Sequence, residues 1–228
     1  MIRKHVSKAR QDWHRWIDSD HSLAALLFFL ILYGFIIYPL AGNQGRADGL
    51  AAWSFSLVLV LGVLATTKHK ATRMGMVVLA ALAFASHWLH FLIRAHSVHV
   101  IAAAASAVFF LVLAALITAR VFRSGGINIF RIYGAIAVYV ILGILWGEFY
   151  ILIYLFEPGA FYFDPSTQYG EPPISELIYF SFTTLTTLGF GDILPVHPMA
   201  RSLTSLEALV GQLYPAVLLA RLVTLYHK

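Results

Sequence analysis

The sequence predicts an all-α membrane protein with six transmembrane helices and one shorter, re-entrant helix. Hydrophobic residues make up 60% of the 228 residues, whereas charged residues make up 12%, well below the ~25% of ordinary soluble domains. The charged residues lie mostly in short segments between long apolar runs. Six of these runs reach the ~17–25 residues that a helix needs to cross a bilayer.

The six runs divide the chain into a four-helix domain over residues 22–120, a linker over 121–131 and a second domain over 132–228. The spans are expected at residues 22–40, 50–66, 74–93, 98–118, 132–156 and 202–225. The apolar segment at 175–186 is too short to cross, which predicts a helix that enters the membrane and ends within it.

The distribution of Lys and Arg predicts that both termini lie in the cytoplasm. Basic residues gather in the N-terminal segment, in the linkers after the second and fourth spans and after the last span. The opposite side carries Arg46, Arg94 and Arg201. Positive residues favour the cytoplasmic side of membrane proteins. Residues 1–21 combine basic charge with apolar residues at helical spacing, which indicates an amphipathic helix at the cytoplasmic interface; a partly disordered tail is the alternative.

The segment TTLTTLGFGDILP, residues 183–195, is rich in threonine and glycine, which are poor helix formers. Non-helical backbone at membrane depth is tolerated only where it is buried in protein or lines a watery path. The C-terminal carbonyls of the preceding short helix are expected to be unpaired, so that their partial negative charge stabilises a cation at mid-membrane. Glycine accepts positive φ, so alternating glycines can turn successive carbonyls to one side.

Four such strands around an axis would form stacked rings of carbonyl oxygens that replace the hydration shell of K⁺. One strand per chain then requires a homotetramer. The predicted filter consists of Thr187, Leu188, Gly189, Phe190 and Gly191, with K⁺ bound at the first four of these. The residues expected to support the filter are Asp192, Tyr179, Thr183, Thr186 and Glu207. Phe190 is expected to point away from the axis, and Asp192 to hydrogen-bond to the short helix at Tyr179.

The run Thr187-Leu188-Gly189-Phe190-Gly191-Asp192 resembles the Thr-Val-Gly-Tyr-Gly-Asp signature of the potassium-channel pore family. The threonines at 183–186 resemble the end of that family's pore helix, and EALVGQLYPAVLLARLV resembles the inner helices of prokaryotic ion channels. The resemblance covers about residues 132–226 and is only architectural before them. It implies a six-helix potassium channel of a bacterial inner membrane, with K⁺ and no organic cofactor. Two positions differ, since leucine replaces valine and phenylalanine replaces tyrosine, which removes a hydroxyl that can tether the filter.

Gly211 and Pro215 interrupt the last predicted span and loosen its helix. The resemblance implies a gating hinge at these two positions, and close helix packing at Gly211 is a compatible alternative. Helical spacing places one group of residues on a face that is predicted to line the pore below the filter: Gln212, Pro215, Ala216, Leu219 and Val223.

Two carboxylates fall within predicted spans, Glu148 in the fifth and Glu207 in the sixth. Carboxylates inside a membrane are costly and are usually functional. Either could brace the filter from behind, Glu207 being the stronger candidate. The alternative is that both are ordinary hydrogen-bonded groups at the outer interface.

The first four spans have the position of a voltage sensor but lack its charges. The fourth carries no Lys or Arg before Arg120, which predicts that strong voltage gating is absent. The third and fourth spans carry a histidine group near their outer ends that could sense protons or bind a divalent ion. This group consists of His87, His90, His96 and His99, and interfacial histidines without a ligand are the alternative.

Several classes of function are not expected. The sequence shows no nucleophile–base pair, phosphate loop or metal-ligand motif, so we do not expect an enzyme. There is no cysteine, which excludes disulfides. The net charge of +5 lies in membrane-flanking loops, which argues against nucleic acid. Because the sequence ends at Lys228, no attached cytoplasmic ligand-binding domain is expected. The predicted partners are three further copies and the lipid bilayer; the rival functions are a non-selective or sodium-permeable channel and a transporter or scaffold with a re-entrant loop.

Overall fold

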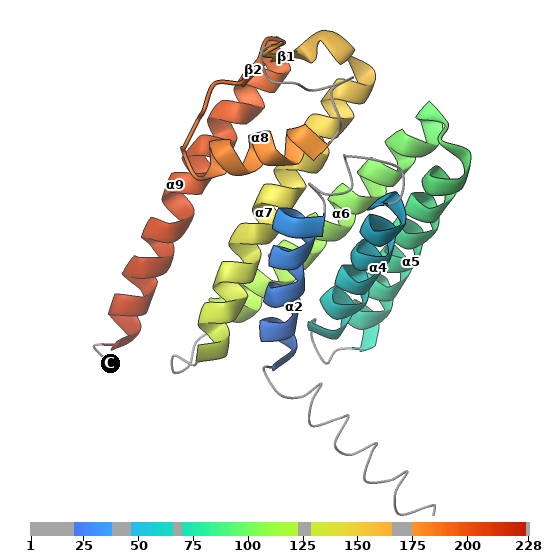
Figure 1. Ribbon diagram of the computed structural model, residues 1–228. Helices are drawn as coiled ribbons and strands as arrows, with labels where there is room; N and C mark the ends of the chain where they lie inside the picture. The colour runs from blue at the N-terminus through green and yellow to red at the C-terminus, as the bar shows by residue number, and fades with distance from the viewer. Residues whose placement is uncertain (1–20, 38–46, 66–69, 123–128, 166–174, 227–228) are drawn as a thin grey trace, which may run out of the picture.

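The computed structural model describes residues 21–37, 47–65, 70–122, 129–165 and 175–226 (Figure 1). The predicted segment 1–21 therefore lies almost entirely outside the described residues. The helices are α2 (His21–Leu32), α4 (Ala47–Ala65), α5 (Lys70–Ile93), α6 (His96–Val121), α7 (Ile129–Phe156), α8 (Ser175–Leu185) and α9 (Pro198–Tyr226). A π-helix, η1 (Tyr33–Ile37), continues α2, and a 3-10 turn, η2 (Pro158–Ala160), follows α7.

The fold is mostly helical, as predicted. Within the described residues, four helices are long and apolar enough to cross a bilayer, namely α5, α6, α7 and α9. The residues of α2 with η1, and those of α4, form shorter apolar helices. The predicted count of six spans therefore stays a prediction.

The two long helices of the second predicted domain begin earlier than predicted. The last helix begins at Pro198 rather than at residue 202, because His197 and Pro198 form a helix start. The side-chain Nδ1 of His197 accepts a hydrogen bond from the N–H of Met199 at 3.2 Å, which caps the first turn. The fifth helix begins at Ile129, inside the predicted linker 121–131.

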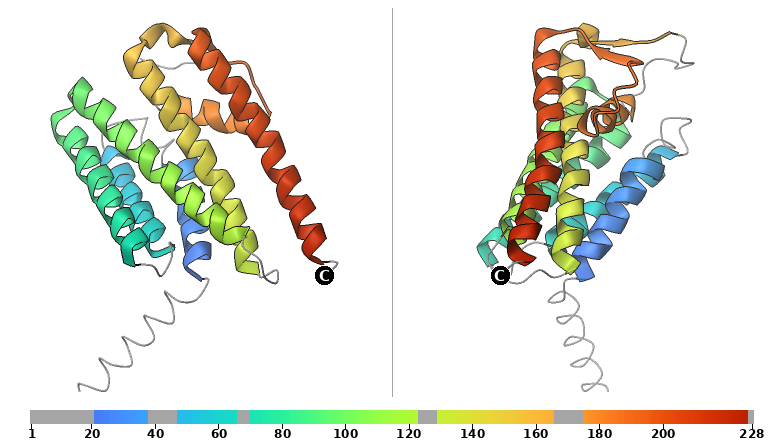
Figure 2. Two further views of the ribbon diagram at one scale, coloured as in Figure 1. Left: turned by 180° about the vertical axis from the view of Figure 1, so that it is seen from behind. Right: turned by 90° about the vertical axis from the view of Figure 1, so that its left-hand side faces the viewer.

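The long helix α7 is the centre of the bundle and packs against α6, α2 and α8. Seen from behind, α4 and α5 lie on one side of the molecule and α8 and α9 lie toward the other, while α6 runs obliquely from the α5 side to the lower end of α7 (Figure 2). The helix α2 begins and α9 ends at the same end of the bundle (Figure 1), and the cytoplasmic location of this end stays a prediction.

The short helix α8 lies across the bundle between α7 and α9, near the end opposite to the C-terminus (Figure 1). Its 11 residues match the length predicted for a helix that cannot cross a bilayer. Thr186 belongs to the turn after α8 rather than to the helix. Entry of α8 into a membrane stays a prediction.

A two-stranded antiparallel sheet, which the sequence did not predict, joins the chain before α8 to the chain after the predicted filter. Strand β1 (Phe161–Phe163) pairs with β2 (Ile193–Pro195), and Phe163 lies opposite Ile193. The N–H of Asp164 also donates to the carbonyl of Asp192 at 2.9 Å. The outer end of the predicted filter is therefore fastened to the segment that follows α7.

Candidate functional site

The helix α8 ends in a Schellman motif in which a threonine occupies the usual glycine position. The N–H of Leu188 donates to the carbonyl of Thr183 at 2.8 Å, and the N–H of Thr187 donates to the carbonyl of Thr184 at 2.9 Å. Thr187 has the left-handed conformation that this motif requires, with φ +59°. A β-branched residue is strained in this region. The motif turns the chain sharply out of α8 and fixes the start of the predicted filter.

The prediction that the last carbonyls of α8 are unpaired is wrong. The Schellman motif uses the carbonyls of Thr183 and Thr184, and the carbonyl of Leu185 accepts a hydrogen bond from the Tyr139 hydroxyl of α7 at 3.0 Å. Buried backbone carbonyls need such partners in an apolar environment. The chain that leaves the helix and a neighbouring helix together supply partners for these three carbonyls.

The hydroxyls of both predicted support threonines on α8 and its end donate back to main-chain carbonyls. Thr183 donates to Phe180 at 2.9 Å, and Thr186 donates to Phe182 at 2.6 Å. The Thr183 carbonyl also accepts the N–H of Gly189 at 3.2 Å. These bonds hold the end of α8 and the first half of the predicted filter as one unit.

Left-handed and ordinary backbone alternate along the predicted filter. Positive φ values occur at Thr187 (+59°), Gly189 (+54°) and Gly191 (+82°), and not at the two residues between them. Glycine takes such values without a steric penalty, and two of the three positions are glycine. The side chains of Leu188 and Phe190 are 62% and 66% exposed in the single chain.

The outer end of the predicted filter packs on α8. The ring of Phe190 stacks on that of Tyr179, with centroids 6.4 Å apart and an interplanar angle of 3°. Asp192 Oδ1 accepts the N–H of Ile193 at 3.2 Å. Partial burial raises the pKa of Glu176 at the start of α8, and the negative charge of Asp192 raises this pKa further. Acidic groups therefore meet at this end, while the predicted hydrogen bond between Tyr179 and Asp192 stays a prediction.

Two glycines on α7 form a groove for α8, and the sequence analysis missed them. A Cβ added at Gly143 would lie 2.4 Å from the Phe182 ring, and one at Gly147 would lie 2.7 Å from Ile178. The two glycines are one turn apart on α7, as are their partners on α8. The signal was present in the sequence, since Gly-Ile-Leu-Trp-Gly has the small-xxx-small spacing of tightly packed membrane helices.

Gly211 of α9 lies against the end of α8. A Cβ at this position would lie 2.0 Å from the carbonyl oxygen of Leu185 and 2.8 Å from its carbonyl carbon. The structure therefore supports the close-packing role that the sequence offered as an alternative. The helix α9 continues through Gly211 and Pro215 without interruption, and a hinge at these residues stays a prediction.

Glu207 on α9 makes hydrogen bonds that join α7, α8 and α9. Its side chain is fully buried, and Oε2 accepts a hydrogen bond from the hydroxyl of Tyr150 on α7 at 2.5 Å. Oε1 lies 2.5 Å from Oγ of Ser181 on α8, and that Oγ lies 2.6 Å from the carbonyl oxygen of Gly143. These contacts agree with a bracing role for Glu207 against α8, and that role stays a prediction. Glu148 is also buried, and its role stays a prediction.

The predicted lining residues lie on a face of α9 that the single chain leaves open. Gln212, Ala216, Leu219 and Val223 are exposed, and Pro215 is partly exposed. Such a face suits a pore, and it equally suits contact with lipid or a second chain. The lining therefore stays a prediction.

The structure brings the predicted histidine group together. The rings of His90 and His99 stack with centroids 4.1 Å apart, and the ring of His87 packs on Phe55 at 4.6 Å. His96 is exposed near them. Across the described ranges, no three His, Cys, Asp or Glu residues are arranged to hold a metal ion, so the divalent-ion hypothesis gains no support. Proton sensing stays a prediction.

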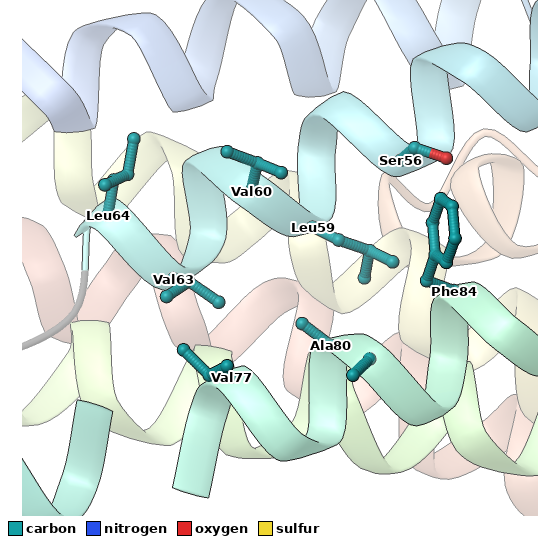
Figure 3. A pocket seen from close by; sticks show the side chains of 9 residues that line it. Ser56, Leu59, Val60, Val63, Leu64, Val77, Ala80 and Phe84 are labelled. Carbon is teal, nitrogen blue, oxygen red and sulfur yellow. The ribbon is translucent and has the colours of Figure 1, made fainter. Parts of the chain in front are cut away.

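An open apolar pocket of about 270 Å³ lies between α4 and α5 (Figure 3). Its single polar lining residue, Ser56, donates a hydrogen bond to the carbonyl of Ala52 at 2.7 Å and accepts one from the indole N–H of Trp88 at 3.1 Å. The rest of the lining of this pocket is apolar, which does not suit an ion. The pocket is built from helices other than α8 and α9 and is separate from the predicted filter.

Residues 136–228 match a family model described as ion channel. This range holds most of α7 and all of α8, the predicted filter and α9. A comparison with curated proteins found no match. The family match, together with four helices long and apolar enough to cross a bilayer, supports a cation-channel pore in an integral membrane protein.

Proposed function

We propose that the protein is a potassium-selective channel that conducts K⁺ passively through a pore formed by four copies of the chain. The observation that carries the proposal is the alternation of positive φ at Thr187, Gly189 and Gly191, directly after a helix too short to cross a bilayer. Alternating backbone of this kind can direct successive carbonyls to one side. Rings of such carbonyls replace the water around K⁺.

The tetramer follows from the filter having one strand in each chain. A single strand offers carbonyls from one direction, so several copies around an axis are needed to surround an ion. The packing of Phe190 on Tyr179 agrees with a side chain directed away from that axis. We place the channel in a bacterial inner membrane with both termini in the cytoplasm, following the charge distribution and the resemblance to prokaryotic channels.

Purified protein in a planar bilayer, with K⁺ on one side and Na⁺ on the other, is expected to give a reversal potential that follows the K⁺ gradient. The current should be blocked by Ba²⁺, because that ion resembles K⁺ in size and carries twice the charge. Protein-free bilayers are the control. A reversal potential near zero would favour the non-selective channel. An absence of current from folded protein that has inserted into the bilayer would favour the transporter or scaffold.

The same recordings should show conductance that changes little with voltage. Helix α6 carries no Lys or Arg before Arg120. That side chain donates from Nη1 to the carbonyl of Ala65, the last residue of α4, at 3.1 Å, which is a helix-capping contact. We therefore propose that α2, α4, α5 and α6 form a domain without gating charges. A steep conductance–voltage curve with several gating charges per chain would contradict this.

A further inference from the structure

We propose that Glu207 holds a proton and that, as a neutral acid, it positions α8 behind the filter. The inference rests on the proposed function for its electrical consequence only. The protonation itself follows from the hydrogen-bond geometry of three buried groups on α7, α8 and α9.

Ser181 has one hydroxyl proton but makes short contacts with two oxygen atoms. Its Oγ lies within hydrogen-bond distance of two oxygens, the carbonyl of Gly143 at 2.6 Å and Oε1 of Glu207 at 2.5 Å. A serine hydroxyl has one proton to donate, and a backbone carbonyl can only accept. With an ionised carboxylate, one of these two short contacts would join two oxygens without a proton between them.

A proton on Oε1 of Glu207 satisfies every contact. Glu207 then donates to Ser181, Ser181 donates to the Gly143 carbonyl, and the Tyr150 hydroxyl donates to Oε2 of Glu207 at 2.5 Å. Each donor is used once and each acceptor is paired. The chain of bonds runs from α9 through α8 to α7. It therefore holds Ser181 in place about one turn before the end of α8.

The surroundings agree with a neutral group. Glu207 is fully buried, and its side-chain partners within the described residues are the hydroxyls of Tyr150 and Ser181, not a cation. An isolated charge is costly in such a place. The titratable groups that face it are Tyr150 and, farther away, Tyr139, both on α7; α8 contributes Ser181.

Removing the proton at alkaline pH should therefore loosen α8 and reduce K⁺ flux. The variant Glu207→Gln separates this effect from a general loss of structure. Glutamine is neutral at every pH, its amide N–H can donate to Ser181 and its oxygen can accept from Tyr150. We expect this variant to assemble and to show the same flux at neutral and alkaline pH, whereas the wild type loses flux at alkaline pH.

Infrared difference spectroscopy of the whole protein in lipid tests the proton directly. At neutral pH the wild type should show the carbonyl band of a protonated carboxylic acid, and Glu207→Gln should lack this band. Glu148→Gln is the control, because it alters the other buried carboxyl group, and it should retain the band. If the band is absent from the wild type, or if Glu207→Gln retains it, the protonation of Glu207 is refuted. If the band is lost but wild type and variant lose flux equally at alkaline pH, the positioning role of the proton is refuted. A wild type that shows the band and conducts no K⁺ refutes the proposed function and leaves the protonation standing.

Discussion

Replacing Gly211 with alanine is expected to abolish K⁺ flux and to lower the stability of the folded protein. The added Cβ would lie 2.0 Å from the Leu185 carbonyl oxygen, so atoms must move. The obstacle is backbone at the end of α8, which cannot rotate away as a side chain does. Overpacking of this kind costs about 1–3 kcal/mol, and a backbone clash belongs at the upper end. Liposome flux and thermal unfolding in detergent measure the two effects.

Gly75→Ala is the matched control for this substitution. Gly75 lies in the long helix α5, and a Cβ there would meet nothing within 4 Å. Because alanine is the better helix former by about 1 kcal/mol, this variant should be as stable as the wild type or more stable. Wild-type flux in Gly211→Ala would show that α8 and α9 can separate without disturbing the filter.

Replacing Gly189 with alanine is expected to abolish K⁺ conduction or its selectivity for a different reason. The φ of Gly189 is +54°, and a Cβ would meet no atom within 4 Å in the single chain. The penalty is conformational, since L-residues other than glycine lose about 1–2 kcal/mol in the left-handed region. In the proposed tetramer this conformational penalty occurs in each of the four chains. Reversal potentials with K⁺ and Na⁺ on opposite sides measure the outcome.

Gly159→Ala provides the comparison that isolates the backbone effect. Gly159 also has open space around it, and its φ lies outside the left-handed range. The two substitutions add the same methyl group without a clash, so they differ in backbone conformation. Gly159→Ala should conduct normally. If Gly189→Ala conducts K⁺ with unchanged selectivity, the assignment of residues 187–191 as the filter fails.

Much of the fold could be predicted because apolar length in the sequence reports directly on helices that lie in a membrane. The short helix α8 was predicted from its length, and the alternation of φ was predicted from Gly189 and Gly191. The third left-handed residue, Thr187, was not predicted, because threonine carries no signal for that conformation. It takes the position from the Schellman motif, which satisfies carbonyls of α8.

The parts that sequence could not predict depend on contacts between distant segments. The pairing of Tyr150, Ser181 and Glu207 joins three helices, and no local pattern links these residues. The carbonyls of α8 were expected to be free because α8 was considered alone, whereas the Tyr139 hydroxyl caps Leu185 from α7. Strands β1 and β2 have three residues each, too few for an alternating pattern to be recognised.

The contact between α9 and the end of α8 also limits how the proposed pore can move. The Cα of Gly211 lies against the Leu185 carbonyl, and the filter begins only two residues after Leu185. A rotation or bend of α9 at this level must therefore shift the base of the filter as well. In the proposed channel, a gate formed by α9 would therefore be coupled to the ion sites of the filter, so that a stimulus applied to α9 would alter ion occupancy as well as pore width.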